Sequence, residues 1–111
     1  LLAALNGSPM LYGSQETGYG KAINFFNVVS MDWNADPDLT ARYKAVLGSL
    51  QAAGRDGACT IYNYERVVFV AYDGGPVVGV NTGNAGLTAT LPSWSGLPST
   101  YSFGAYEVKI W

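Results

Sequence analysis

The sequence predicts a mainly β chain, an antiparallel Greek-key β-sandwich preceded by one amphipathic helix. Three observations lead to this fold class. Apolar residues recur with a helical period over about residues 37–52, the period changes to two after Gly57, and Gly-rich turns then separate short apolar runs at regular intervals. Several short strands joined by such turns are typical of a sandwich.

The helix is predicted by its cap and by its apolar stripe. Asp36 is a favoured N-cap residue, and Pro37 stands at the first helical position, where its missing N–H costs nothing. Gly54 is a natural stop. Spacings of three and four place one apolar stripe on this helix, formed by Leu39, Tyr43, Val46, Leu47 and Leu50.

Strand signals fill the part of the chain that follows the helix. Residues 66–72 (RVVFVAY) are almost all apolar, as expected for a central strand that is covered on both faces. The turn DGGP leads from them into VVGVN, which predicts a hairpin. Further strands are indicated in ACTIYNY, LTATL, TYSFG and YEVKIW.

The alternation within these runs also predicts which side chains share a face. Leu87, Ala89 and Leu91 are expected to point into the core. In the last run, one face is expected to carry Tyr106, Val108 and Ile110.

Composition restricts the classes of function. The 111 residues have a net charge of −2, only 13% are charged and no Lys/Arg cluster occurs, so a nucleic-acid partner is not expected. No apolar run approaches the roughly 20 residues of a membrane span. The lone Cys59 cannot form an internal disulfide, and its apolar, Thr-rich surroundings predict a buried structural thiol.

Catalytic chemistry has few candidates. The chain contains no His, which removes Ser/His/Asp and Cys/His nucleophiles and His-based zinc sites. No two carboxylates are positioned as a glycosidase pair across a cleft. The acidic run 32–38 resembles the opening of an EF-hand loop, but Pro37 and Tyr43 stand where that loop needs Gly and Glu. We interpret the run as a helix N-terminus and predict no catalytic residue, metal or cofactor.

The three tryptophans are the candidate sugar-stacking residues. Trp94 lies in the loop PSWSG and is the best candidate for substrate binding, because an aromatic ring in a loop can stack on a pyranose. The alternative for Trp33, Trp94 and Trp111 is that each covers part of the core or a domain interface.

The beginning of the chain contains a short apolar run between turn-forming residues. Residues 10–12 (MLY) follow NGSP and precede GS, a pattern typical of a short buried strand. The first five residues, LLAAL, resemble the end of a helix. They lack an initiator Met and a basic region, so we interpret the start as a cut inside a larger protein.

Three pieces of the chain, in order, resemble the C-terminal part of an α-amylase-family glycoside hydrolase, whose catalytic domain is a (β/α)8 barrel. Residues 1–18 are similar to the family's last barrel strand, residues 31–51 resemble its final barrel helix, and the tail ending in YEVKIW is similar to its C-terminal antiparallel β domain. The first match is carried by Gly7, Ser8, Pro9, Tyr12, Gly13 and Glu16.

This resemblance implies a division of the chain. Residues 1–54 correspond to a remnant of the end of the catalytic barrel, with its last strand and helix, and residues 55–111 to the C-terminal β domain. The family's catalytic residues lie on earlier barrel strands. The resemblance therefore implies a non-catalytic region, inactive alone, of an enzyme that acts on α-glucans such as starch and maltooligosaccharides. It also favours an exported parent.

Two other functions stay open, a stand-alone carbohydrate-binding module that binds α-glucan through Trp94 and an assembly domain that uses a low-charge apolar face.

The partner implied by the resemblance is the missing catalytic barrel. Without that barrel, a strand at residues 10–12 has unpaired main-chain groups and exposed apolar side chains. We expect it to pair with a second copy through residues 1–20, to fold back onto the helix, or to cover the sandwich.

Overall fold

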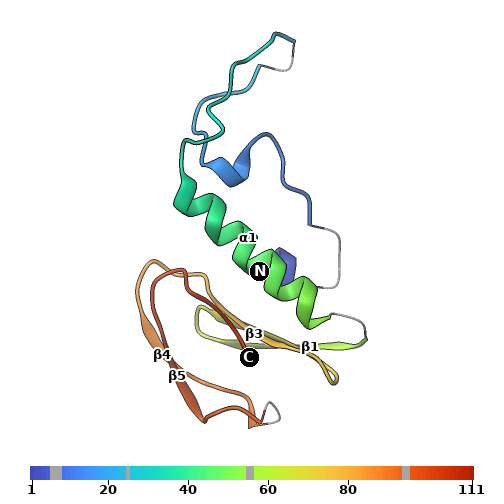
Figure 1. Ribbon diagram of the computed structural model, residues 1–111. Coiled ribbons are helices and arrows are strands. Elements are labelled where there is room, and N and C mark those ends of the chain that lie inside the picture. The colour runs from blue at the N-terminus through green and yellow to red at the C-terminus, as the bar shows by residue number, and fades with distance from the viewer. Residues whose placement is uncertain (6–8, 25, 55–56, 94–95) are drawn as a thin grey trace.

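The computed structural model describes residues 1–5, 9–24, 26–54, 57–93 and 96–111 (Figure 1). Its elements are the 3-10 helices η1 (Leu2–Ala4) and η2 (Gln15–Thr17), the α-helix α1 (Pro37–Ala53), and the strands β1 (Cys59–Tyr64), β2 (Val67–Tyr72), β3 (Val77–Asn81), β4 (Leu87–Thr90), β5 (Thr100–Phe103) and β6 (Val108–Ile110). The prediction of a mainly β chain with one α-helix is confirmed.

The helix α1 begins and ends where the sequence predicts. The Asp36 carboxylate accepts a hydrogen bond from the Leu39 N–H at 2.8 Å, which satisfies one of the free donors of the first turn. Pro37 occupies the first helical position, and Gly54 ends the helix with a φ of 74°. The five residues of the predicted stripe are buried or half-buried, and Leu50 is only 2% exposed.

The strands form two antiparallel sheets. The larger sheet has the order β1-β2-β3-β6, and β4 pairs with β5 in a second sheet. In the larger sheet Phe69 of β2 lies between Tyr62 of β1 and Gly79 of β3, and Gly79 in turn lies opposite Lys109 of β6. This arrangement is consistent with a β-sandwich. The Greek-key connection stays a prediction.

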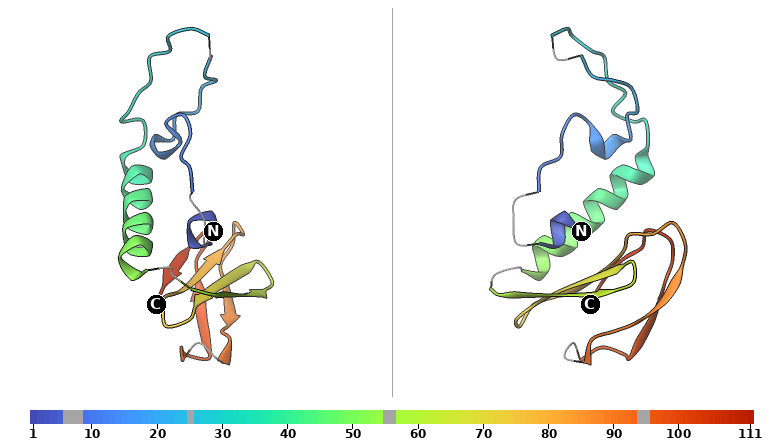
Figure 2. Two further views of the ribbon diagram at one scale, coloured as in Figure 1. Left: turned by 90° about the vertical axis from the view of Figure 1, so that its right-hand side faces the viewer. Right: turned by 180° about the vertical axis from the view of Figure 1, so that it is seen from behind.

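Three layers enclose two apolar cores (Figure 2). The four-stranded sheet is the middle layer, with α1 and η1 on one face and the β4–β5 sheet on the other. The helix-side core contains Ala4, Leu50, Val70, Tyr72, Val78 and Val80. The core between the sheets contains Val67, Phe69, Ala89, Leu91 and Phe103, with Tyr101 and Trp111 packed against it.

The central strand β2 contributes to both cores, as its almost continuous apolar sequence predicts. Val70 and Tyr72 face α1 and η1, whereas Val67 and Phe69 face the second sheet. The Tyr72 hydroxyl donates a buried hydrogen bond to the Ala4 carbonyl at 2.8 Å, which ties η1 to the sheet. The prediction of a central strand covered on both faces is therefore confirmed.

Asn81, at the end of β3, holds two turns together through one buried side chain. Its amide nitrogen donates to the carbonyls of Ala85 at 2.8 Å and Gly104 at 2.6 Å, and its amide oxygen accepts from the Gly83 N–H at 2.9 Å. The side chain is almost fully buried, so these three bonds replace the water it loses on folding. The turn after β3 and the turn before β6 are fixed relative to each other as a result.

Three local predictions are wrong. Residues 10–12 form no strand, because no described strand lies beside them to take their main-chain hydrogen bonds. Cys59 is exposed and not buried, because it lies on the edge strand β1, which contributes nothing to the helix-side core. Tyr106 does not share the face of Val108 and Ile110, because it lies in a turn with a φ of 53° and is exposed.

Candidate functional site

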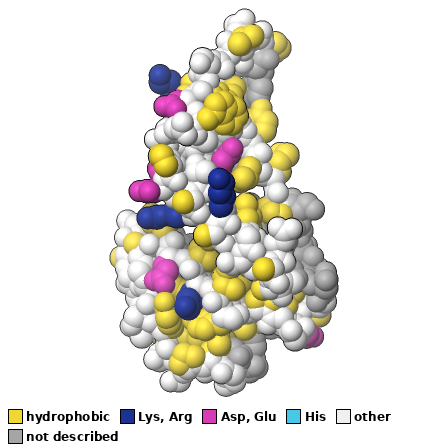
Figure 3. All heavy atoms as spheres, viewed as in Figure 1, with side chains coloured by type: hydrophobic (Ala, Val, Ile, Leu, Met, Phe, Trp, Pro, Cys, Tyr) yellow, Lys and Arg dark blue, Asp and Glu magenta, His cyan; other side chains and the backbone are white. Residues whose placement is uncertain are grey.

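The most unusual surface of the molecule is a segment before α1 that extends away from the sandwich. We call residues 9–24 and 26–36 the N-terminal arm; it continues beyond the first turn of α1 in both views of Figure 2. Figure 3 shows its hydrophobic side chains open to solvent at the top of the view. The large apolar residues exposed on it are Met10, Leu11, Tyr12, Phe26, Val28 and Trp33.

Several of these side chains are exposed over most of their surface. Met10 is 78% exposed, and Phe26 and Val28 are 95% and 103% exposed. Few charges accompany them, since the described arm carries only Glu16, Lys21, Asp32 and Asp36. Large exposed apolar side chains with few charges among them are typical of a contact surface for another molecule.

The size of the exposed surface supports the same interpretation. The chain has a radius of gyration of 16.2 Å, whereas a compact domain of this length has about 13 Å. Its accessible surface is 7171 Å², against about 5,900 Å² for a folded monomer of 11.8 kDa. The excess of more than about 1,000 Å² exceeds the roughly 800 Å² that one partner contributes to a standard interface.

The base of the arm is fixed to the helix. Residues Gly13 and Ser14, with φ values of 55° and 60°, turn the chain into η2. The Thr17 hydroxyl donates to the Ser14 carbonyl at 2.8 Å, and the Thr40 hydroxyl of α1 donates to the Glu16 carbonyl at 3.0 Å. The arm is therefore joined to α1 by defined contacts at residues 14–17, and exposed apolar residues lie on both sides of them in the chain, Met10 to Tyr12 before and Phe26, Val28 and Trp33 after.

Of the six residues that carry the resemblance to the family's last barrel strand, three lie at this base. The Tyr12 carbonyl accepts a hydrogen bond from the Gln15 N–H. Gly13 forms the turn, and Glu16 belongs to η2. Pro9 is exposed just before them. Gly7 and Ser8 lie outside the described residues. The motif thus forms a turn and a 3-10 helix, and not the strand that the sequence predicts.

The three tryptophans lie in different parts of the chain and differ in their surroundings. Trp94, the predicted sugar-binding residue, lies outside the described residues. Trp111 packs in the core between the sheets, with its ring centroid 5.4 Å from that of Tyr101, so the prediction of a structural role is confirmed for it. Trp33 is exposed on the arm and belongs to the apolar surface described above.

A carboxylate–phenol pair that sequence reasoning missed lies at the turn between β5 and β6. Glu107 accepts hydrogen bonds from the Gly104 N–H at 2.6 Å and from the Tyr101 hydroxyl at 2.8 Å. The Gly104 N–H, the Tyr101 hydroxyl and the nearby Lys109 charge lower the pKa of Glu107. The hydrogen bond to Glu107, burial and the Glu107 charge raise the pKa of Tyr101. In the sequence, the position of Glu107 three residues after Gly104 was the only indication of this pair. The two hydrogen bonds fix the turn between β5 and β6.

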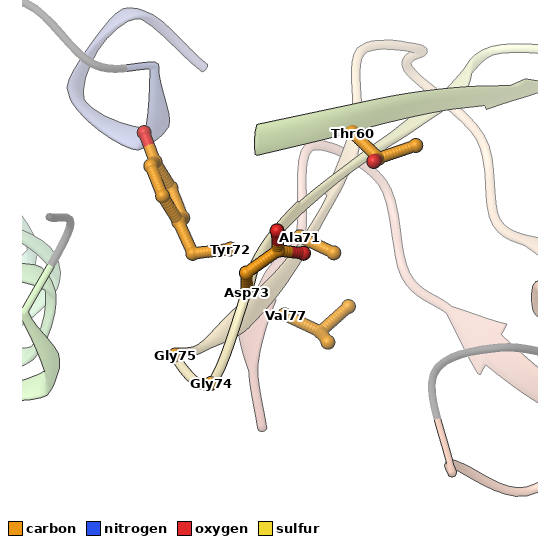
Figure 4. Close-up of a pocket in the computed structure, with 7 residues that line it drawn as sticks. All are labelled: Thr60, Ala71, Tyr72, Asp73, Gly74, Gly75 and Val77. Carbon is orange, nitrogen blue, oxygen red and sulfur yellow. The ribbon is translucent and has the colours of Figure 1, made fainter. Parts of the chain in front are cut away.

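One open hollow lies at the end of the β2–β3 hairpin (Figure 4). It is lined by Thr60, Ala71, Tyr72, Asp73, Gly74, Gly75 and Val77. The Tyr72 ring points away toward η1, and Asp73 is the only carboxylate of the lining. Its volume of about 250 Å³ is below the roughly 300–1,000 Å³ of small-molecule sites, and a lone carboxylate offers no acid–base pair.

A second hollow, of about 300 Å³, lies between α1 and β6. Val46, Val108 and Ile110 supply its apolar walls, and Ser49 and Lys109 lie at its polar side. All three apolar residues are only half-buried. The helix-side core is therefore incompletely covered along β6, which adds a second patch to the apolar surface.

The described part of the chain contains no group of three or more side chains that is able to hold a metal ion. None of the described helices combines the length and hydropathy that a membrane crossing requires. Comparison with protein-family models, curated proteins and solved structures finds no match. Among the described residues, the feature that points to a function is the exposed apolar surface of the N-terminal arm.

Proposed function

We propose that this chain is the non-catalytic C-terminal region of an α-amylase-like glycoside hydrolase that acts on α-glucans, and that it supports the catalytic barrel. The observation that carries the proposal is the N-terminal arm, an apolar surface attached by defined contacts to one end of α1. A barrel edge that lacks its last strand and helix offers the kind of partner that such a surface needs.

In this proposal the two parts of the chain have different tasks. Residues 1–54 complete the barrel, with the arm as the segment that enters it as a strand when the barrel is present. Residues 55–111 form the C-terminal β domain, with the Greek-key connection that its sequence predicts. The helix-side core joins them, since Leu50 of α1 and Ala4 of η1 pack on the same face of the sheet. Exposed Met10 and Phe26 are then buried by the barrel and not by this chain.

A complementation experiment tests the proposal. The chain is mixed with an α-amylase catalytic barrel truncated before its last strand, and association is measured by isothermal titration and size-exclusion chromatography. We expect a complex that is weakened at least about tenfold by Phe26→Ser with Val28→Ser, because these are the most exposed apolar side chains of the arm. The control is Thr90→Lys, an exposed residue on the β4–β5 sheet.

Activity assays separate the proposal from its alternatives. Turnover of starch by the isolated chain would overturn a non-catalytic role. Binding of maltoheptaose that is lost in Trp94→Ala, without association with the barrel, would favour a carbohydrate-binding module. Self-association that depends on Met10 and Leu11 would favour a homo-oligomer through residues 1–20.

A further inference from the structure

We propose that the outer edge of β1 is a self-association site, at which a second copy of the chain adds its own β1 in antiparallel orientation. The inference is independent of the proposed function and concerns a different surface. β1 is the end strand of the order β1-β2-β3-β6, so no described strand lies on its outer side.

The register identifies the main-chain groups that face outward. The Asp73 N–H donates to the Ala58 carbonyl at 3.2 Å, and Tyr64 lies opposite Val67 at the turn of the hairpin. In an antiparallel ladder, residues alternate between those bonded to one neighbour and those that point the other way. The N–H and C=O groups of Cys59, Ile61 and Asn63 therefore point away from β2, and we call them the β1 edge.

The β1 edge lacks the features with which natural edge strands avoid pairing. Such strands are usually short, charged, bulged or interrupted by Pro. β1 has six residues, CTIYNY, with no charge and no Pro, and it pairs with β2 in an unbroken register along its whole length. Ile61 is 52% exposed, and Cys59 and Asn63 are also exposed, so no described segment covers this end of the sheet.

A second copy is the partner that fits this edge. When two β1 strands pair about a two-fold axis through Ile61, Ile61 lies opposite its symmetry mate and Cys59 lies opposite Asn63 of the second copy. Each of the three residues then exchanges its N–H and C=O with the partner, and no like charges meet because β1 carries none. The interface is isologous, so it closes as a dimer.

The other free edge of this sheet is a poorer partner. β6 has three residues against the six of β1, and it carries Lys109 in its middle. Pairing of β1 with β6 of a second molecule is also head-to-tail, so it leads to open chains of molecules and not to a dimer. The β1–β1 arrangement satisfies more main-chain groups and closes.

Cysteine cross-linking tests the register. In the Asn63→Cys variant, the new thiol lies opposite Cys59 of the second copy, at the Cα separation of about 5.5 Å that a disulfide accepts. We expect most of this variant to become a covalent dimer under mild oxidation. Wild type, with Cys59 alone, and Asn63→Cys with Cys59→Ser are the controls. In both, the like thiols are four residues apart along the strands, about 13 Å, and we expect no cross-link.

Sedimentation equilibrium of the wild-type chain tests the dimer itself. We expect a dimer of the 11.8 kDa chain whose dissociation constant rises at least about tenfold in Ile61→Lys, since two Lys side chains then face each other. Thr90→Lys adds the same charge to an exposed strand residue elsewhere and should leave the constant unchanged. Far-UV circular dichroism checks that Ile61→Lys is folded, and if it is not, the cross-linking result decides.

Several results would overturn the proposal. These are a monomer at every concentration up to about the millimolar range, equal cross-linking of Asn63→Cys and its controls, or a dimer that survives Ile61→Lys. A dimer that is lost in Phe26→Ser with Val28→Ser but kept in Ile61→Lys would assign self-association to the arm and would also refute the role of the β1 edge.

Discussion

Substitution of Gly79 by Ala tests how tightly the core between the sheets is packed. Gly79 lies in the middle of β3, beneath a cluster of aromatic rings. A Cβ atom at this position would lie 2.7 Å from Phe103 Cζ, 3.1 Å from Phe69 Cε1 and 3.1 Å from Trp111 Cζ3. Real Cβ atoms essentially never approach within 3.0 Å of another heavy atom, so at least one ring must move.

The rings cannot move independently of one another. The Phe69 and Phe103 centroids are 5.9 Å apart in an edge-to-face arrangement, and the Trp111 centroid lies within 6.5 Å of both. An added methyl group in such a core costs about 1–3 kcal/mol. Replacement of a glycine inside a strand by Ala by itself raises the free energy of unfolding by about 0.5–1 kcal/mol. The cost is larger, and we expect Gly79→Ala to lower the free energy of unfolding by about 1–2 kcal/mol.

Urea unfolding followed by Trp fluorescence measures this difference, with thermal unfolding as a second readout. At this chain length, about 1–2 kcal/mol corresponds to a fall in Tm of roughly 4–8 °C. The matched control is Gly48→Ala in α1, where a Cβ meets nothing within 4 Å. That variant should be more stable by about 1 kcal/mol, because Ala is the better helix former. A Gly79→Ala protein as stable as wild type would refute the tight packing of the rings.

Three further predictions concern other parts of the fold. Leu50→Ala opens a cavity between α1 and the sheet and should lower the free energy of unfolding by about 2–5 kcal/mol in a urea titration. Asn81→Ala removes three hydrogen bonds that join two turns and should cost about 2–4 kcal/mol, whereas retention of full stability would show that water replaces them. Glu107→Gln tests the lowered pKa of that carboxylate. Ionised Glu107 stabilises the fold above the pKa of an unfolded Glu, about 4.3, and this stabilisation is lost as the pH falls through the lower pKa of the folded state. The difference in unfolding free energy between wild type and variant should therefore be constant from about pH 7 to 5 and shrink below about pH 4. A difference that grows toward low pH would contradict the direction of the shift.

Much of the fold follows from signals that are local in the sequence. The cap at Asp36 and the apolar stripe of α1 depend only on residues within a few turns, and both are confirmed. The inward positions of Ala89 and Leu91 follow from strand alternation, and both residues are buried. The two-sided burial of β2 follows from its continuous apolar run.

The errors arise where burial depends on distant parts of the chain. The run of residues 10–12 has the composition of a buried strand, but strand formation requires a neighbouring strand, and composition does not report whether one is present. Cys59 has the surroundings of a buried thiol, but whether β1 is an edge or a central strand depends on the order of pairing, which brings β6 and not β1 beside β3. The candidate interface was predicted only in part. The sequence indicated an apolar liability at residues 10–12, but nothing in it singled out Phe26 and Val28, because their exposure depends on how the chain before α1 is placed.

The tip of the arm and the sheet that contains β1 lie beyond opposite ends of α1 (Figure 1), so a contact through Phe26 and Val28 does not compete with one through the β1 edge. The arm leads into α1 at Pro37, and β1 begins at Cys59, after the helix has ended at Ala53. A helix of 17 residues is about 25 Å long. A dimer formed through β1 therefore carries two free arms and should bind two truncated barrels. Light scattering of the mixture distinguishes this complex, of two chains and two barrels, from a complex of one chain and one barrel. Ile61→Lys should release single chains that still bind a barrel, whereas Phe26→Ser with Val28→Ser should leave a dimer that binds none. If either variant abolished both associations, the two surfaces would have to be parts of one interface, and the separation argued from the length of α1 would be wrong.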